Sequence, residues 1–420
     1  MSDLEGLNMP KLKVIELFAG VGGFRLGLDN TNKKMFETVW GNQWEPSKKV
    51  QHAFDCYDKR FENGIKSNQD IAKVSDKELQ NTHADVVVGG FPCQDYSVAR
   101  SLKGELGIVG KKGVLFWEIV RTIQNTYPKY VLLENVDRLL KSPSNQRGRD
   151  FAVMLSTLHE LGYEVEWRVI NAADYGNAQR RRRVFIFAYR KNISYSQEMS
   201  FNKDDEMIFK KGFFARAFPV EQLPNKDRVA ETELSEDIVK VSDNFTFKFF
   251  NTGIMRNGKI TTIDTVPVYE KAIPLKDILE VEVDSKYILD EEKLAKFKYL
   301  RSGKKINRVS KDGFKYTYSE GGMSELDSLD LPGRTMLTSE GTMNRSTHIV
   351  EQDGVKRFIT PKEAERLNGF PDNWTNTMSD RARYFCMGNA LVVPLITRMG
   401  NEIENIENKY PNRLSQIELF

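Results

Sequence analysis

The stretch ELFAGVGGFRLGL (16–28) decides which fold class the sequence predicts. A short apolar strand is expected to end just before its glycines, and a helix is expected to follow them. Gly20, Gly22 and Gly23 let the backbone pass close to a ligand, and the free N–H groups of a helix start favour an anionic group. Counted from Gly20, the last glycine of the dinucleotide pattern GxGxxG is replaced by Arg25, which disfavours NAD and FAD. Another nucleoside cofactor, or a simple tight turn, remains open.

Apolar runs alternate with helical patterns on both sides of this turn, as far as about residue 190. The expected strands are KVIELF (13–18), MFETVWG (35–41), DVVVGG (85–90), YVLLENV (130–136), VEWRVI (165–170) and RVFIFAY (183–189). The clearest helical patterns between them are residues 113–126 and 150–162. Strands that alternate with helices imply a parallel sheet covered on both faces. The predicted fold class is therefore α/β, with a mostly parallel sheet.

The composition and the hydrophobic periodicity of the sequence change after Arg190. Residues 191–330 are rich in Lys, Asp, Glu and Phe and have weaker periodicity, which favours a separate, irregular domain. Within this domain a strand is expected at FTFKFF (245–250) and a helix at DEEKLAKFKYL (290–300).

Regular signals return in the last part of the chain. In TPKEAERLNGF (360–370) Thr360 is a plausible helix N-cap, and Glu363 is placed to close a capping box. A last apolar helix is expected over ALVVPLITRMGNEIENI (390–406). The predicted division is a catalytic domain (1–190), a recognition domain (191–330) and a C-terminal segment that completes the catalytic domain (331–420).

Composition and charge restrict the class of protein. The 420 residues include 62 basic and 59 acidic ones, a net charge of +3 that only weakly indicates a polyanionic partner. No apolar run is long enough for a membrane span and no signal peptide is recognisable, so a cytosolic protein is expected. The three cysteines lie far apart and only four histidines are present, which disfavours disulfides and a metal site.

One cysteine has sequence neighbours that favour a catalytic role. In VVGGFPCQDYS (87–97) Cys93 follows Pro92 just after a predicted strand. Most lone cysteines are buried and inert, but open parallel sheets bind ligands beyond the carboxyl ends of their strands. The next segment (99–113) carries glycines and lysines and is typical of a mobile basic loop. Cys93 is therefore a candidate nucleophile.

Charged side chains also end or begin other predicted strands. Glu134, in LLENV (132–136), lies at a carboxyl end, where a carboxylate is costly unless it is paired or used. In AQRRRRVFIF (178–187) strand geometry places Gln179, Arg181 and Arg183 on one side and the intervening arginines on the other. MGNALVVP (387–394) is interpreted as a Gly-Asn turn that leads into the last helix.

Taken together, these segments resemble the C5-cytosine methyltransferase family. The resemblance rests on FAGVGG, FPCQ, ENV, QRRRR in a Q-x-R-x-R form and GNAL, which occur in the family's order, with RLNGFPDNW (366–374) and LPGRTMLTSEG (331–341) as further similar segments. It covers about residues 1–190 and 331–420. The family's fold implies a Rossmann-like sheet that binds S-adenosyl-L-methionine, and a smaller target-recognition domain where residues 191–330 lie.

The resemblance also implies a mechanism and its residues. The Cys93 thiolate would attack C6 of a cytosine swung out of double-stranded DNA, and Glu134 would hold or protonate N3. C5 would then accept the methyl group, with Arg183 on O2 and Arg181 supporting the same pocket. Residues 94–112 would close over the flipped base, while side chains in 191–330 would choose the DNA sequence.

For the cofactor, the resemblance implies a pocket of ten residues. They are Phe18, Gly20, Gly23, Gln43, Trp44, Asp70, Ile71, Pro92, Leu115 and Asn389. Trp44 would stack on the adenine and Asp70 would accept from its amino group, although core packing and helix capping explain these two residues equally simply. Most members place an acidic residue where this chain has Gln43, whose amide can still bind ribose hydroxyls.

Three other functions stay in view. They are methylation of cytosine in tRNA, a catalytically inactive DNA-binding module, and a nicotinamide oxidoreductase, which the Gly20–Arg25 spacing disfavours. Chain length and the single recognition region resemble bacterial restriction-modification methylases, which leaves a cognate restriction endonuclease open as a partner. A monomer is expected, because one unit can flip one base. The segments around the motifs resemble those of methylases that modify GATC.

Overall fold

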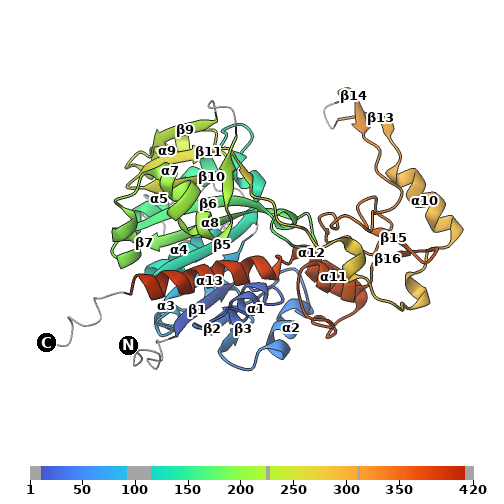
Figure 1. The fold of residues 1–420 in the computed structure, drawn as a ribbon, viewed down its shortest axis with the longest axis horizontal. Coiled ribbons are helices and arrows are strands. Elements are labelled where there is room, and N and C mark those ends of the chain that lie inside the picture. The colour runs from blue at the N-terminus through green and yellow to red at the C-terminus, as the bar shows by residue number, and fades with distance from the viewer. Residues whose placement is uncertain (1–10, 92–114, 224–227, 311–312, 412–420) are drawn as a thin grey trace.

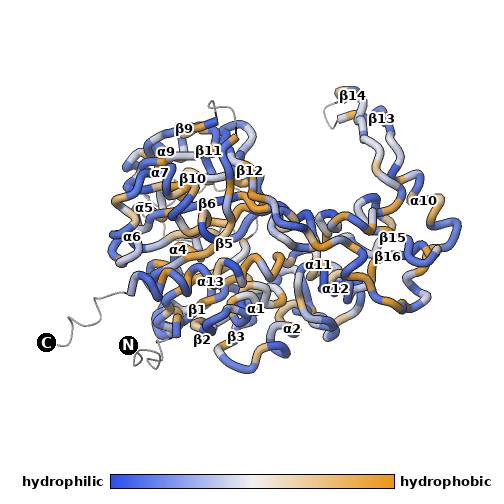
Figure 2. Tube along the Cα trace, viewed as in Figure 1, coloured by the Kyte–Doolittle hydropathy of each residue, from blue (hydrophilic) through white to orange (hydrophobic). Residues whose placement is uncertain are grey.

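A computed structural model describes residues 11–91, 115–223, 228–310 and 313–411. The chain forms a larger lobe around one central sheet and a smaller lobe (residues 275–389) beside it (Figure 1). Hydrophobic stretches run through the middle of the larger lobe, and hydrophilic ones follow its outer turns (Figure 2). No helix within the described ranges is long and apolar enough to cross a membrane.

The central sheet has ten strands in the order β3-β2-β1-β4-β5-β7-β6-β10-β11-β9. Neighbours from β3 to β5 are parallel, and every pair from β5 to β9 is antiparallel. The parallel half comprises β1 (Leu12–Leu17), β2 (Phe36–Asn42), β3 (Ile65–Ser67), β4 (Val86–Gly90) and β5 (Tyr130–Val136). The other half comprises β6 (Tyr163–Asn171), β7 (Arg182–Arg190), β9 (Val229–Glu233), β10 (Thr252–Arg256) and β11 (Lys259–Ile263). The six strands expected before residue 190 are confirmed.

Helices cover both faces of this sheet, which explains why its strands are apolar runs rather than alternating patterns. Val87 belongs to a core cluster on one face, together with side chains of α4 (Leu115–Thr126) and α5 (Arg149–Glu160). Val86 and Val88 belong to the cluster on the other face, together with side chains of α1 (Gly23–Asp29) and α13 (Val393–Lys409). The predicted α/β fold class is confirmed.

Helix α13 brings the end of the chain back to its beginning. Cβ atoms added at Gly27 or Gly400 would lie 2.5 Å from atoms of the opposite helix region, so these glycines allow α1 and α13 to pack closely. The Thr397 hydroxyl donates to the carbonyl of Gly27 at 2.9 Å. Glu404 accepts hydrogen bonds from backbone amides just before β2. The last helix is therefore part of the same layer as the first.

The sheet continues past the expected boundary at residue 190. β10, β11 and β9 extend it, and β8 (Val220–Gln222) pairs with β12 (Thr265–Pro267) beside it. The helical elements of this region are α6 (Ser194–Met199), α7 (Asp204–Glu206), the π-helical turn η5 (Met207–Lys211), α8 (Phe213–Ala217) and α9 (Ile238–Asn244). Residues 191–268 are thus built onto the larger lobe.

The strand predicted at FTFKFF (245–250) is wrong. These residues are extended but belong to no strand of the structure, because their rings pack on a helix and a tryptophan instead of pairing in a ladder. The Phe249 ring lies 4.9 Å from that of Phe151 in α5 and 5.7 Å from that of Trp167 in β6.

The smaller lobe contains short helices and two hairpins. Its elements are η6 (Leu275–Ile278), η7 (Ser285–Tyr287), α10 (Glu291–Arg301), β13 (Lys304–Val309), β14 (Lys315–Glu320), β15 (Ile349–Gln352), β16 (Val355–Phe358), α11 (Pro361–Leu367) and α12 (Asp380–Asn389). The predicted helix at 290–300 is confirmed as α10, and the Thr360 capping box is present at α11. Gly388 and Asn389 end α12 rather than form a turn, and α13 begins only at Val393.

Short elements complete the larger lobe. They are α2 (His52–Arg60) between β2 and β3, η1 (Ile71–Lys73) and α3 (Asp76–Gln80) between β3 and β4, η3 (Asp137–Lys141) after β5, and η4 (Ala172–Asp174) between β6 and β7.

Candidate active site

Two oppositely charged side chains meet where β5 ends and β7 begins. The antiparallel register sets Val136 opposite Arg183, so the side chain of Glu134 lies one pleat away on the same face. Arg183 Nε lies 2.8 Å from Glu134 Oε1, and the two side chains are 18% and 14% exposed. The sequence thus predicted two charged residues that the fold brings into direct contact at a partly open strand end.

The neighbouring strand end leads toward the expected nucleophile. Gly90, the last residue of β4, pairs with Glu134, and a Cβ atom added at Gly90 would lie 3.2 Å from the carboxylate. Asn135 donates from its side chain to the carbonyl of Phe91 at 2.9 Å. Pro92 and Cys93 follow directly but lie outside the described residues, as does the loop expected to close over the base. The chain therefore enters the Cys93 segment immediately beside Glu134.

The arginine run alternates as strand geometry predicts. Gln179 and Arg181 are buried, while Arg180 and Arg182 are exposed. Arg181 donates to the carbonyls of two residues far away in sequence, Met336 at 3.2 Å and Gly388 at 2.9 Å. Burial, and then the positive charge of Arg183, lower the pKa of Arg181 to about 9. Arg181 thus joins three segments of chain behind the Glu134–Arg183 pair.

Sequence reasoning missed a buried amide network that holds the same region. Gln179 donates from Nε2 to the side-chain oxygen of Asn368 at 2.7 Å and accepts from the amide of Met336 at 3.1 Å. Asn368 in turn donates to the carbonyl of Met387 at 2.8 Å. The signal was the asparagine within the RLNGFPDNW segment, which the sequence singled out without assigning it a role.

The glycine turn after β1 has an unusual backbone. Phe18, Gly20 and Gly22 have φ angles of 55°, 57° and 88°, in the left-handed region that favours glycine. The amide of Gly20 donates to the side-chain oxygen of Gln43 at 2.8 Å. A Cβ atom added at Gly20 would meet nothing within 4 Å, whereas one at Gly23 would lie 3.0 Å from Leu391. The turn is therefore closed behind Gly23 and open in front of Gly20.

A buried carboxyl group supports this turn. Glu16, in β1, is fully buried and accepts a hydrogen bond at 3.2 Å from the amide of Arg25 in α1. Burial raises the pKa of Glu16 to about 7, although the hydrogen bonds from Arg25 and Tyr57 oppose the rise. Glu16 therefore ties the strand to the helix across the glycines.

The other residues expected around the cofactor lie at several depths. Trp44, Asp70 and Leu115 are half-buried, Ile71 is buried and Asn389 is exposed. One oxygen of Asp70 accepts from the amide of Ala72 at 3.1 Å, so this carboxylate caps η1 as the simpler alternative required. An open glycine turn, a half-buried indole and a half-buried carboxylate fit a nucleoside cofactor such as S-adenosylmethionine. The oxygen of Gln43 is already bound to Gly20, so its NH₂ group is the part suited to a ribose oxygen.

The two described cysteines are poor nucleophiles. Cys56 and Cys386 are buried, and burial raises the pKa of their thiols to about 11 and about 12. A thiolate is the reactive form of cysteine, so neither residue suits covalent catalysis. No group of His, Cys, Asp and Glu side chains that could hold a metal ion occurs in the described part of the chain.

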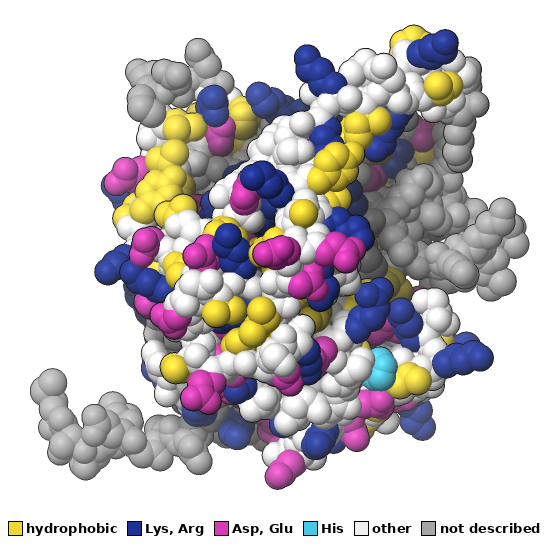
Figure 3. Space-filling view, turned by 90° about the vertical axis from the view of Figure 1, so that its right-hand side faces the viewer, with side chains coloured by type: hydrophobic (Ala, Val, Ile, Leu, Met, Phe, Trp, Pro, Cys, Tyr) yellow, Lys and Arg dark blue, Asp and Glu magenta, His cyan; other side chains and the backbone are white. Residues whose placement is uncertain are grey.

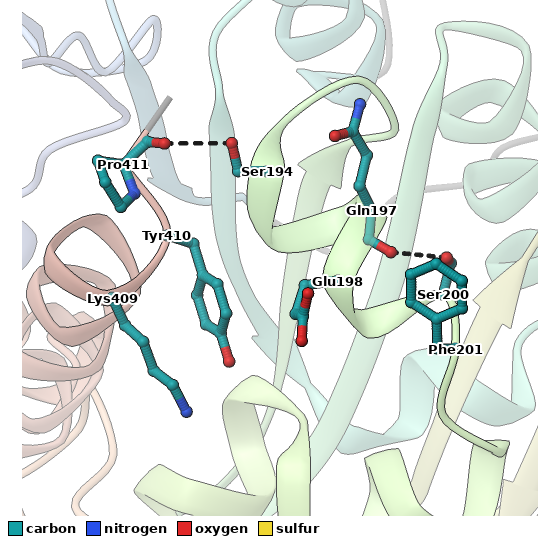
Figure 4. A pocket seen from close by; sticks show the side chains of 8 residues that line it. All are labelled: Ser194, Gln197, Glu198, Ser200, Phe201, Lys409, Tyr410 and Pro411. Carbon is teal, nitrogen blue, oxygen red and sulfur yellow. Dashed lines mark hydrogen bonds between the residues drawn. The ribbon is translucent and has the colours of Figure 1, made fainter. Parts of the chain in front are cut away.

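A cavity of about 690 Å³ lies away from these residues. Side chains of α6 and of the end of α13 line it, including Glu198, Phe201 and Tyr410 (Figure 4). α6 follows the far end of β7, so the cavity and the Glu134–Arg183 pair lie at opposite ends of that strand. The cavity therefore takes no part in the candidate active site.

Comparisons with known proteins agree with this geometry. The family model "C-5 cytosine-specific DNA methylase" matches residues 12–405. Type II methyltransferase M.Sau3AI of Staphylococcus aureus is 67% identical over 412 residues, which cover 98% of this chain and 100% of that protein. Type II methyltransferase M1.ScrFI of Lactococcus lactis subsp. cremoris is 29% identical over 97% of this chain and 82% of its own length.

A solved structure shares the fold. The S. pombe Dnmt2 methyltransferase superposes with a TM-score of 0.58 at 15% identity, over 96% of this chain and 100% of that chain. Members of the matched family use S-adenosylmethionine as the methyl donor, which fits the open glycine turn. The chain belongs to the C-5 cytosine-specific DNA methylase family and is an S-adenosylmethionine-dependent DNA (cytosine-5-)-methyltransferase.

Proposed function

We propose that Cys93, Glu134 and Arg183 carry out the methylation of a cytosine flipped out of duplex DNA. The Cys93 thiolate adds to C6, the electron pair of the C5–C6 double bond forms a C4–C5 double bond, and the electron pair displaced onto N3 takes a proton from Glu134, which then holds the protonated N3. S-adenosylmethionine, when bound, supplies an electrophilic methyl group on a sulfonium. C5 takes that methyl group, which leaves the sulfonium as a neutral thioether. The C5 proton then passes to water, the electron pair of the C5–H bond restores the C5–C6 double bond as the Cys93–C6 bond breaks and returns the thiolate, and N3 gives its proton back to Glu134.

The observation that carries this proposal is the contact between Arg183 and Glu134. N3 and O2 are adjacent atoms on one edge of cytosine, and a guanidinium beside a carboxyl group presents a matching pair of partners. The 2.8 Å separation of Arg183 Nε and Glu134 Oε1 supports a joint role on that edge, with Arg183 on O2 and Glu134 on N3. Arg181 is a positioning residue in this proposal, because both of its terminal nitrogens donate to carbonyl groups behind the pair.

We propose that the glycine turn and its neighbours hold the cofactor. The main contacts are assigned to Phe18, Gly20 and Gly23 around the methionine end, Trp44 on the adenine face and Asp70 at its amino group. The open space in front of Gly20 and the half-buried state of Trp44 and Asp70 support this assignment. Further contacts are proposed for Gln43, Ile71, Pro92, Leu115 and Asn389.

We propose a revised division of the chain. Residues 191–268 go with the catalytic domain, because their strands extend its sheet, and residues 275–358 of the smaller lobe take the role of target recognition. Affinity for DNA would come from phosphate contacts and sequence choice from base contacts in this lobe.

The cellular role follows from the similarity to restriction-modification methylases. We propose that the enzyme works as a monomer in the cytoplasm and protects host DNA from a cognate restriction endonuclease. The 67% identity to M.Sau3AI extends over nearly the whole chain, including the smaller lobe, which supports a shared target sequence. GATC is the first target to test, since the segments around the motifs resemble those of GATC methylases.

Transfer of radiolabelled methyl from S-adenosylmethionine to unmethylated plasmid DNA, followed by bisulfite sequencing, tests the proposal. The wild type is expected to label cytosine in one short repeated sequence, Cys93→Ala to transfer nothing, and the matched variant Cys56→Ala to retain activity. Activity of Cys93→Ala would contradict the covalent mechanism. Transfer to tRNA but not to plasmid DNA would favour the tRNA alternative, and cofactor binding without any transfer would favour an inactive DNA-binding module.

A further inference from the structure

A two-stranded hairpin projects from the smaller lobe. β13 and β14 pair antiparallel over their whole length, from Lys304 opposite Glu320 to Val309 opposite Lys315, and join no other sheet (Figure 1). All but the first residue of β13 and the last of β14 are exposed. An isolated two-stranded hairpin in water has marginal stability. A projecting ribbon without a core of its own would therefore be stabilised by a binding partner. Residues 304–320 are called the basic hairpin below.

The basic hairpin has the same net charge as the whole protein. It contains five basic and two acidic residues, a net +3, and the entire chain also has a net charge of +3. The rest of the molecule is therefore neutral overall. In Figure 3, which faces the smaller lobe, dark blue basic side chains lie among yellow hydrophobic ones along the upper part of that face. A basic patch that contains aromatic residues is typical of a nucleic-acid contact.

The two faces of the basic hairpin differ in chemistry. Cross-strand partners share a face, so one face carries the basic and bulky side chains of Lys304, Ile306, Arg308, Tyr316 and Tyr318, with Glu320 at the root of the hairpin. Here the Arg308 guanidinium lies 4.3 Å from the centre of the Tyr318 ring. The opposite face is polar apart from the exposed Val309, and it carries Lys305, Asn307, Lys315, Thr317 and Ser319.

The polar face has the groups that read bases. The Thr317 hydroxyl donates to the side-chain oxygen of Asn307 at 3.0 Å, which holds both side chains in one orientation across the strands. Amide and hydroxyl groups hydrogen-bond base edges in the major groove of B-DNA, and that groove is wide enough for a two-stranded ribbon. The exposed Lys305 and Lys315 on the same face are suited to the phosphates at its rims.

The base of the hairpin is rigidly held. Arg301, the last residue of α10, is 1% exposed and donates to the carbonyls of Ser324 and Glu325 just after the hairpin. The same guanidinium pairs with Asp327 at 3.0 Å. Arg345 pairs with Glu320 and donates to the carbonyl of Gly321 at 2.7 Å. The ribbon is thus anchored at its root, as an element that enters a groove requires.

We propose that the basic hairpin enters the major groove of the target duplex, with Asn307 and Thr317 contacting base edges and Lys305 and Lys315 contacting phosphates. The proposal rests on the function of the smaller lobe proposed above and assigns the recognition step to named side chains. It also identifies Asn307 and Thr317 as residues that determine specificity.

Binding and methylation of two duplexes by hairpin variants test the proposal. One duplex carries the sequence that the wild type methylates in plasmid DNA, and the other has the same length without it. Asn307→Ala with Thr317→Ala is expected to weaken binding of the target duplex roughly ten- to hundred-fold and to leave binding of the other duplex unchanged. Lys305→Ala with Lys315→Ala is expected to weaken both and to reduce the slope of log affinity against log salt by about two.

The matched control is Lys296→Ala, which removes an exposed lysine of α10 in the same lobe and is expected to behave as the wild type. All substituted residues are exposed, so thermal melting is expected to be unchanged and a folding defect would be visible there. Wild-type affinity, specificity and salt slope in both double variants would overturn the proposal and point to a protein partner for the hairpin. Absence of methyl transfer by the wild type itself would instead contradict the proposed function.

Discussion

Replacing Glu16 by glutamine is expected to make the protein more stable at neutral and alkaline pH. Burial raises the pKa of this carboxyl group to about 7 in the folded protein, from an ordinary value of 4.5. Between these two pH values the unfolded chain has released a proton that the folded protein still binds, so rising pH favours unfolding. The stability that protonated Glu16 preserves is fully present below 4.5 and is lost as pH rises through about 7.

The size of the effect follows from the same two values. The interval between 4.5 and about 7, at about 1.4 kcal/mol per pH unit, corresponds to a loss of roughly 3 kcal/mol of unfolding free energy. Glutamine has no proton to lose, and its side-chain oxygen can still accept the hydrogen bond from the amide of Arg25. The Glu16→Gln variant is therefore expected to lack this component of the pH dependence.

Urea unfolding measured at fixed ionic strength from about pH 5 to about pH 8 provides the assay, because the unfolding free energy is read directly at each pH. The wild type is expected to lose roughly 2–3 kcal/mol over this range relative to Glu16→Gln. Glu37→Gln makes the same chemical change at an exposed position of β2 and is expected to follow the wild type. An identical pH dependence in Glu16→Gln and wild type would refute the reasoning.

Three further changes have defined outcomes. Arg181→Met leaves two buried carbonyl groups without their donor, so the melting temperature and the methyl-transfer rate should both fall, with a stability loss of about 2–4 kcal/mol. A slower methyl transfer at unchanged stability would contradict the positioning role of Arg181. Gly22→Ala places a Cβ atom 2.3 Å from an aromatic ring and should lower the free energy of unfolding, measured by heat or urea, by about 2–4 kcal/mol. Its control is Gly354→Ala, also at positive φ but with no described atom within 4 Å, which should lower it by only about 1–2 kcal/mol. Cys386→Ala should retain methyl transfer, since burial raises the pKa of its thiol to about 12; loss of transfer with normal folding would show that it takes part in the reaction.

The sequence predicted β1, β2, β4 and β5 well because these strands are largely buried, whereas the short and mostly exposed β3 was missed. A run such as DVVVGG is too short for a typical helix, and glycines mark its end. The Thr360 capping box was equally predictable, because capping depends on residues only three positions apart. Local chemistry determined these elements.

The extension of the sheet beyond residue 190 depends on contacts distant in sequence. β10 lies against β6 because Gly253 leaves room for the ring of Trp167, a match that no local pattern reveals. The β10–β11 hairpin did carry a local signal, since Asn257-Gly258 stands between two short β-rich segments and is a favoured two-residue turn. FTFKFF has the alternation of a strand, but its alternate rings fill the space beside α5 instead.

In the candidate site, too, local sequence predicted some features, while others depend on contacts between residues distant in sequence. Motifs predicted that Glu134 and Arg183 lie at strand ends, and strand alternation predicted that Arg181 lies on the same side as Arg183. The partners of Arg181 lie 155 and 207 residues away, so its role behind the pair could only be found in the folded chain. The bond from Gly20 to Gln43 likewise joins two loops whose proximity the sequence does not encode locally.

The packing of α13 on α1 sets the order in which this enzyme can be made. Part of the apolar surface of α1 is covered by residues 393–409, so on a nascent chain that part stays exposed until these residues have been synthesised. A chain that stops before Val393 would therefore leave part of α1 uncovered, besides lacking α13 itself.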